Sequence, residues 1–207
     1  MLFQILVRLR CARAAARTGL LSRRWQGLWS RLPGLTFRNI LAGKIKSALA
    51  HVARRTSVSL REIRLSRSVS LAERKHDDAR AKSLLGSAAR LSPEEIVFVL
   101  PQFSLPKRGR GVTIVLPSFR RATSIELDTR SLRIMPPAAG ELPVLEMLSI
   151  SGKIVDVGAL LNRCPRLRVL RITFRGVGVD PGSLEAELAT LEAAAALGLV
   201  VSHLGIE

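Results

Sequence analysis

Histidine, cysteine and acidic side chains are the groups through which this chain could carry out acid–base, nucleophilic or metal chemistry. The histidines and cysteines are few: His51, His76, His203, Cys11 and Cys164. Catalytic and zinc sites bring such residues together, often at spacings such as H-E-x-x-H, C-x-x-C or G-x-S-x-G. None of these spacings occurs, and His76-Asp77-Asp78 is best interpreted as a solvated polar turn. We therefore predict a protein that is not an enzyme and needs neither cofactor nor metal.

The stretch Pro106-Lys-Arg-Gly-Arg-Gly111 is the nearest approach to a phosphate-binding loop. Such a loop ends in Gly-Lys-Ser/Thr and continues into a helix whose first amides face the phosphate. This stretch lacks that ending, and Val112 to Leu116 is typical of a strand. We interpret it as a basic loop.

Positive charge is concentrated in the first half of the chain. The net charge is +17, and residues 1–90 hold 20 Lys and Arg against 4 Asp and Glu. Such a half can bind nucleic acid, an anionic membrane or an acidic protein. Aromatic residues on which bases could stack are scarce there, and the longest apolar runs fall far short of the roughly 20 residues of a membrane helix. We expect neither nucleic acid nor membrane as a partner.

The first 36 residues are predicted to form short helices. Leu2, Ile5, Leu6 and Leu9 make one apolar stripe at helical spacing, and an Ala-rich helix follows before a break at Thr18-Gly19. A second helix is predicted over residues 21–32, with its apolar stripe on Leu21, Trp25, Leu28, Trp29 and Leu32. Pro33-Gly34 should end it. Because residues 1–61 contain no Asp or Glu, an organellar transit peptide stays open as an alternative.

A short pattern of the form L-x-x-L-x-L, with other aliphatic residues allowed, recurs from residue 57 onward. It occupies residues 60–65, 95–100, 122–127, 145–150 and 167–172, with steps of 35, 27, 23 and 22 residues. These steps converge on the 20–29 residue period of leucine-rich repeats. Alternation at the last two positions predicts a strand in each unit, and helix-like or irregular segments, such as the helix-like 157–163, lie between the units. A strand-like segment at 199–204 and a helix near 184–195 close the chain.

The sequence therefore predicts an α/β protein: a short helical domain followed by an irregular leucine-rich-repeat solenoid with a parallel sheet. The expected divisions are a helical domain at 1–36, a connecting segment at 37–56 and repeats at 57–207. Five unrelated strands of an ordinary α/β domain are the alternative.

The helical domain resembles an F-box, the small domain that docks substrate receptors onto the Skp-type adaptor of a cullin ubiquitin ligase. Ile5-Leu6-x-x-Leu9 resembles its first helix, and Leu21-Ser-Arg-Arg-Trp25-x-x-Leu28-Trp29 resembles the signature of its last helix. An F-box opens with Leu-Pro and acidic or polar residues, and this chain begins inside the first helix. In the repeats, Cys164-Pro-x-Leu167-x-x-Leu170 looks like a motif found in the leucine-rich repeats of plant F-box proteins, a family whose members often continue into a C-terminal region called FBD.

This resemblance implies a non-catalytic substrate-recognition subunit that works in the nucleus or cytoplasm. It would bind the adaptor, and through it a cullin, by Leu6, Leu9, Leu21, Trp25, Leu28 and Trp29. An unknown protein target would contact the outward-facing positions of the repeat strands. These candidate target-binding residues are Glu62, Arg64, Glu126, Asp128, Met147, Ser149, Arg171 and Thr173. The main rival is a leucine-rich-repeat scaffold whose degenerate F-box no longer binds the adaptor.

Overall fold

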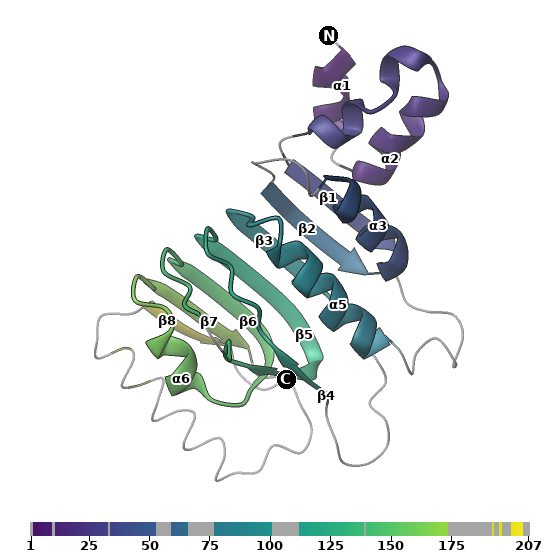
Figure 1. Cartoon of the computed structure of the whole chain (residues 1–207). Helices are drawn as coiled ribbons and strands as arrows, with labels where there is room; N and C mark the ends of the chain where they lie inside the picture. The colour runs from purple at the N-terminus through teal and green to yellow at the C-terminus, as the bar shows by residue number, and fades with distance from the viewer. Residues whose placement is uncertain are drawn as a thin grey trace. The chain divides into compact units, whose positions relative to one another are not determined.

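The protein is an α/β protein whose strands pair in parallel (Figure 1). The chain divides into two compact units, Met1–Pro101 and Gln102–Glu207. The computed structural model describes residues 2–9, 11–32, 34–52, 59–65, 77–100, 112–138, 140–173, 192, 195 and 200–204.

The first unit begins with short helices and continues into a small parallel sheet. The helical part comprises α1 (Leu2–Arg8), α2 (Ala12–Arg17) and three 3₁₀ turns, η1 (Thr18–Leu20), η2 (Arg23–Trp25) and η3 (Leu28–Arg31). The sheet part comprises β1 (Gly34–Ile40), α3 (Ala42–Val52), β2 (Ser59–Leu65), α5 (Asp77–Ala89) and β3 (Glu95–Val99). β2 pairs in parallel with β1 and with β3. The helices α3 and α5 lie side by side against one face of this sheet (Figure 1).

The helix predicted over residues 21–32 is wrong as a continuous element. Ser22 is extended, Gln26 is extended, and Gly27 is left-handed with a φ of 72°. The chain therefore forms two separate 3₁₀ turns where the apolar spacing predicted one helix. Glycine is the residue that enters the left-handed region without steric cost, so Gly27 is where the helical path is interrupted. The predicted helices near 2–9 and 12–17 are confirmed as α1 and α2.

The segment predicted as a connection, 37–56, contains regular structure. β1 runs through its beginning, and α3 fills most of the remainder. Leu35 and Phe37, two residues apart, are buried and point to the same face of β1. The sheet of this unit thus begins at Gly34, well before the predicted start at residue 57.

The second unit contains a parallel sheet in the order β4-β5-β6-β7-β8. Its elements are β4 (Val112–Val115), β5 (Ser124–Met135), β6 (Met147–Ile154), α6 (Val157–Asn162), β7 (Val169–Thr173) and β8 (Val200–Leu204). The strand-like segments at 112–116 and 199–204 and the helix at 157–163 are confirmed by β4, β8 and α6. The Asp156 side chain caps α6 by accepting a hydrogen bond from the Ala159 amide at 2.7 Å. The helix predicted near 184–195 lies outside the described residues.

The strands of the second unit pair so that equivalent pattern positions lie side by side. Ile125 pairs with Leu148, which pairs with Leu170. Two residues further on, Leu127 pairs with Ile150, which pairs with Ile172. All six side chains are buried. The predicted steps of 23 and 22 residues therefore equal the sequence separations of the residues that pair between β5 and β6 and between β6 and β7.

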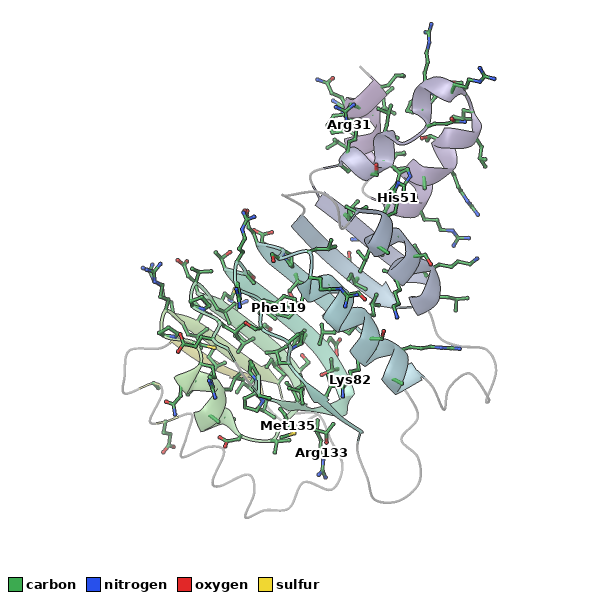
Figure 2. The ribbon with its side chains drawn as sticks, viewed as in Figure 1. Arg31, His51, Lys82, Phe119, Arg133 and Met135 are labelled. Atoms are coloured by element: carbon green, nitrogen blue, oxygen red, sulfur yellow. The ribbon has the colours of Figure 1, made fainter. Side chains whose placement is uncertain are left out.

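The backbone makes the same pair of hydrogen bonds before β6 and before β7. The Thr123 carbonyl accepts from the amides of Glu146 and Met147 at 2.9 and 3.0 Å. At the next strand, the Glu146 carbonyl accepts from the amides of Arg168 and Val169 at 2.8 and 2.9 Å. These bonds hold the starts of β6 and β7 in line. Below them, the core includes Phe119, labelled in Figure 2, together with Leu142, Leu145 and Leu160.

The β5–β6 pairing has one irregularity, at which a glycine is required. Asp128 pairs with Ser151 and Arg133 with Lys153, so five residues along β5 accompany two along β6. Gly152 lies at this point with a φ of 154°, and a Cβ there would come within 3.1 Å of both the carbonyl oxygen and Oγ1 of Thr129. The Thr129 side chain is buried, so it cannot easily move away.

Gly152→Ala is expected to lower the free energy of unfolding by about 1–3 kcal/mol, because alanine adds backbone strain and a contact with Thr129. Urea unfolding followed by circular dichroism measures this change. Gly158→Ala is the matched control in the same unit, because a Cβ at that position of α6 meets only an ordinary contact at 3.6 Å. The control should be neutral or stabilising, by up to about 1 kcal/mol. Equal stability of the two variants would contradict this view of Gly152.

Candidate protein-docking surfaces

The N-terminal helical segment, residues 2–32, leaves several large apolar side chains in water. Leu20 and Leu21 are the most exposed, at 87% and 72%. On α1 and its C-terminal end the exposed apolar residues are Phe3, Ile5, Val7 and Leu9. Single exposed apolar residues are common, and here six lie within 20 residues of one another in the sequence.

The same segment exposes only positive charge. Arg8, Arg13, Arg17, Arg23, Arg24 and Arg31 are all exposed, and the segment contains no Asp or Glu. Arginines at the rim of an apolar contact favour an acidic partner and steer its approach. The positive charge of this segment would therefore attract an acidic partner more than a basic one.

The six candidate adaptor-binding residues fall into three classes of exposure. Leu6 is 1% exposed and belongs to the core of the segment, so it can only support a docking surface. Leu9 and Leu21 are exposed, whereas Trp25, Leu28 and Trp29 are half-buried.

Trp29 holds the N-terminal helical segment against the sheet part of its unit. Its indole ring stacks on the imidazole of His51, with ring centroids 5.7 Å apart and planes at 22°. His51 lies in the last turn of α3 (Figure 2). One face of Trp29 is therefore occupied inside the unit, and His51 has a packing role that its isolated position in the sequence did not indicate.

Of the candidate target-binding residues in the first unit, Glu62 is already engaged. Its carboxylate accepts a hydrogen bond from Nε of Arg38 at 2.7 Å, which forms an ion pair between β2 and β1. The side chain of Arg64 lies outside the described part of the chain. The two residues are neighbours on β2, and nothing in the geometry of this unit singles them out as a binding site.

In the second unit, β5, β6 and β7 share one face whose side chains are at least partly exposed. We call it the open face. Its middle row is Glu126, Ser149 and Arg171, which pair across the three strands. Glu126 and Arg171 are exposed and Ser149 is half-buried between them.

Two further rows flank the middle row of the open face. On one side lie Ser124, Met147 and Val169, and on the other lie Asp128, Ser151 and Thr173. All six are half-buried. The register thus brings together all six candidate target-binding residues of this unit, and it adds Ser124, Ser151 and Val169, which the sequence interpretation left out. The period-2 alternation of each strand was the signal that could have identified them.

The Cys164 thiol, an ionisable group that could act in chemistry, is placed for packing. Burial raises the pKa of the Cys164 thiol to about 11, so the thiol stays protonated and unreactive near neutral pH. Within the described residues, no three His, Cys, Asp or Glu side chains gather as metal ligands would. His76 and the side chain of His203 lie outside that part. None of the helices described has the length and apolar composition needed to span a membrane.

Comparison of the chain with protein-family models, with curated proteins and with solved structures found no match.

The two cysteines should differ in reactivity. With iodoacetamide at pH 8, Cys11, which is half-buried, is expected to be alkylated first. Cys164 should react at least about tenfold more slowly, because a thiol of pKa about 11 is ionised in roughly one molecule in a thousand at that pH. Peptide mass spectrometry distinguishes the two sites. In urea both should react alike, and equal rates in the native protein would show that Cys164 is not buried.

Proposed function

We propose that the protein is a substrate-recognition subunit of a Skp–cullin–F-box ubiquitin ligase. In this role it performs no bond chemistry. The N-terminal helical segment binds the Skp-type adaptor, and the open face holds a protein target, so that the target is kept at high effective concentration beside the ligase. Such a subunit of plant FBD type would act in the nucleus or cytoplasm.

The observation that carries the proposal is the exposed apolar set of the N-terminal helical segment. Leaving Leu20 and Leu21 in water is unfavourable, and each could contribute about 1.5–3 kcal/mol when buried by a partner. The set lies within the residues whose sequence resembles an F-box, and arginines surround it in the sequence. An adaptor with an acidic, apolar-pocketed surface would complement both features.

Within this proposal the six predicted adaptor-binding residues have different roles. Leu9 and Leu21 are exposed and would contact the adaptor directly. Trp25 and Leu28 are half-buried and would offer their remaining surface. Leu6 and Trp29 would act as supports, since one is buried and the other stacks on His51.

One observation favours the rival, a leucine-rich-repeat scaffold with a degenerate F-box. The stretch that resembles the last F-box helix forms two 3₁₀ turns separated by Gly27. Trp25 and Leu28 therefore do not lie on one continuous helical face. Adaptor binding would then require this stretch to rearrange, and the cost would weaken the complex.

Leu20→Asp combined with Leu21→Asp should weaken adaptor binding by at least about 30-fold, because two exposed apolar anchors become charged. Titration calorimetry of the intact protein with a purified Skp-type adaptor measures this. The folded state should be retained, since both side chains are largely outside the core. Val155→Asp is the control, because Val155 is an exposed apolar residue of the second unit, and its change should leave adaptor affinity as it was.

The wild-type chain itself separates the two candidate functions. A complex with micromolar or better affinity that weakens in high salt supports the ligase subunit, because the arginines would be screened. The absence of any complex at micromolar concentrations favours the scaffold. Full binding by the double variant would mean that the adaptor contacts another surface.

A further inference from the structure

Two large apolar side chains are exposed among the described residues of the second unit, and the strand pairing places them side by side. They are Met135, 40% exposed at the end of β5, and Val155, 49% exposed directly after β6. The Val155 amide donates a hydrogen bond to the Ile134 carbonyl at 2.9 Å, which extends the β5–β6 pairing to this point. On the other side, Met135 pairs with the half-buried Val115 of β4. These three side chains form an apolar row across the carboxyl ends of β4, β5 and β6.

A basic row lies directly before the apolar row. Arg133 is exposed and lies two residues before Met135 on β5 (Figure 2). It pairs with the exposed Thr113 of β4 and with Lys153 of β6. The part of the chain that the structure describes contains no hydrogen-bond or ion-pair partner of the Arg133 side chain. Its guanidinium group is therefore available to an anionic group of a partner.

The acidic residues of this sheet do not compete for the basic row. Asp128 lies in the preceding row and already takes part in an interaction within the protein. Glu126 lies in the row of Arg171, four residues earlier along β6, which corresponds to about 13 Å. That distance exceeds the Debye length of about 8 Å at physiological salt. Asp156, which follows the apolar row, caps α6. A ligand at the basic row therefore meets positive charge.

The two rows match an acidic side chain that is followed by an apolar one. Arg133 and Met135 are two residues apart on one strand, which corresponds to about 7 Å. Alternate side chains of an extended segment point to the same side with the same separation. An acidic side chain at Arg133 therefore brings the side chain two positions further on to Met135 and Val155. Methionine is flexible and adapts to apolar side chains of different shape.

We propose that the carboxyl ends of β4, β5 and β6 are a docking site for an extended protein segment of the pattern acidic–x–apolar. The acidic side chain pairs with Arg133, and Lys153 adds a second positive charge to the same row. The apolar side chain covers Met135 and Val155. Charge complementarity selects the first residue of the segment, and burial of the exposed apolar row selects the third. The inference rests on the proposed function, because it specifies the chemistry of the target that the ligase subunit would hold.

Three labelled peptides of equal length in a Gly-Ser background test the pattern. Their central residues are Glu-Ser-Leu, Lys-Ser-Leu and Glu-Ser-Ser. The intact protein should bind the Glu-Ser-Leu peptide best, and each of the others about tenfold more weakly, because each lacks one of the two contacts. Fluorescence anisotropy measures the affinities. Equal affinity for the three peptides, or binding of none of them at concentrations up to about 1 mM, overturns the inference.

Matched variants locate the site. Arg133→Glu should weaken the Glu-Ser-Leu peptide about tenfold and should bind the Lys-Ser-Leu peptide better than the wild-type protein does. Met135→Ser should weaken the Glu-Ser-Leu peptide and leave the Glu-Ser-Ser peptide unchanged. The controls are Arg166→Glu, between α6 and β7, and Leu41→Ser, in the first unit. Both alter exposed residues and should leave all affinities unchanged. Arg133→Gln gives a second measurement of the charge contact if the reversal lowers the yield of folded protein.

Two results would assign the basic and apolar rows differently. Equal losses of affinity in the site variants and the control variants would mean that the peptide binds elsewhere. Binding to phosphatidylserine vesicles that Arg133→Glu abolishes, without a preference among the peptides, would assign the rows to a membrane surface. Either result overturns the inference.

The adaptor titration on the same preparations separates this inference from the proposed function. Adaptor binding without a preference for the Glu-Ser-Leu peptide overturns the inference and leaves the proposed function in place. A Glu-Ser-Leu preference that depends on Arg133, in a protein that does not bind the adaptor, contradicts the ligase proposal and supports the docking site.

Discussion

Parallel pairing of β5, β6 and β7 in one register is the constraint on which the second unit depends. Successive side chains of a strand point to opposite faces, so a slip of one residue would bring Leu148 and Ile150 to the open face and Ser149 into the core. The hydrogen bonds that the carbonyls of Thr123 and Glu146 accept hold the starts of β6 and β7 in line. The register therefore fixes the core and the chemistry of the open face together.

The N-terminal helical segment obeys a different constraint, because it has little core of its own. Leu6, Ala12, Ala15 and Leu32 are buried there. The remaining anchorage to the sheet includes the stacking of Trp29 on His51. A segment of this size that exposes several large apolar side chains among arginines gains stability when a partner covers them. Its composition fits a surface that is completed by binding.

The strands β5, β6 and β7 could be predicted from sequence because two independent signals coincide in them. Period-2 alternation identifies each strand, and the steps of 23 and 22 residues match the register that the structure shows. The prediction of one helix over 21–32 was wrong. The spacing of Leu21, Trp25 and Leu28 shows which side chains would align on a helix, but it does not show that the backbone between them is helical. Gly27 takes the left-handed conformation there and interrupts the path. β1 was missed because Pro33-Gly34 was interpreted as the end of a helix that is followed by a connecting segment. Leu35 and Phe37 nevertheless alternate as in a strand.

The candidate binding residues were likewise predictable from the sequence only in part. Alternation alone predicted six residues of the open face, since facing direction follows from position along a strand. Contacts between distant segments cannot be predicted in this way. Neither the ion pair of Glu62 with Arg38 nor the stacking of His51 on Trp29 follows from the spacing of residues in the sequence. These contacts decide which candidate side chains are available to a partner, and only the folded structure shows them.

The exposed apolar side chains of the N-terminal helical segment are the feature on which the proposed function depends. Titration calorimetry of the intact protein with a purified Skp-type adaptor, in parallel with the Leu20→Asp and Leu21→Asp double variant, tests this dependence most directly. Micromolar or tighter binding by the wild-type protein, weakened at least about 30-fold in the variant, is the expected result. The absence of a complex at micromolar concentrations, or equal affinity of the two proteins, would contradict it.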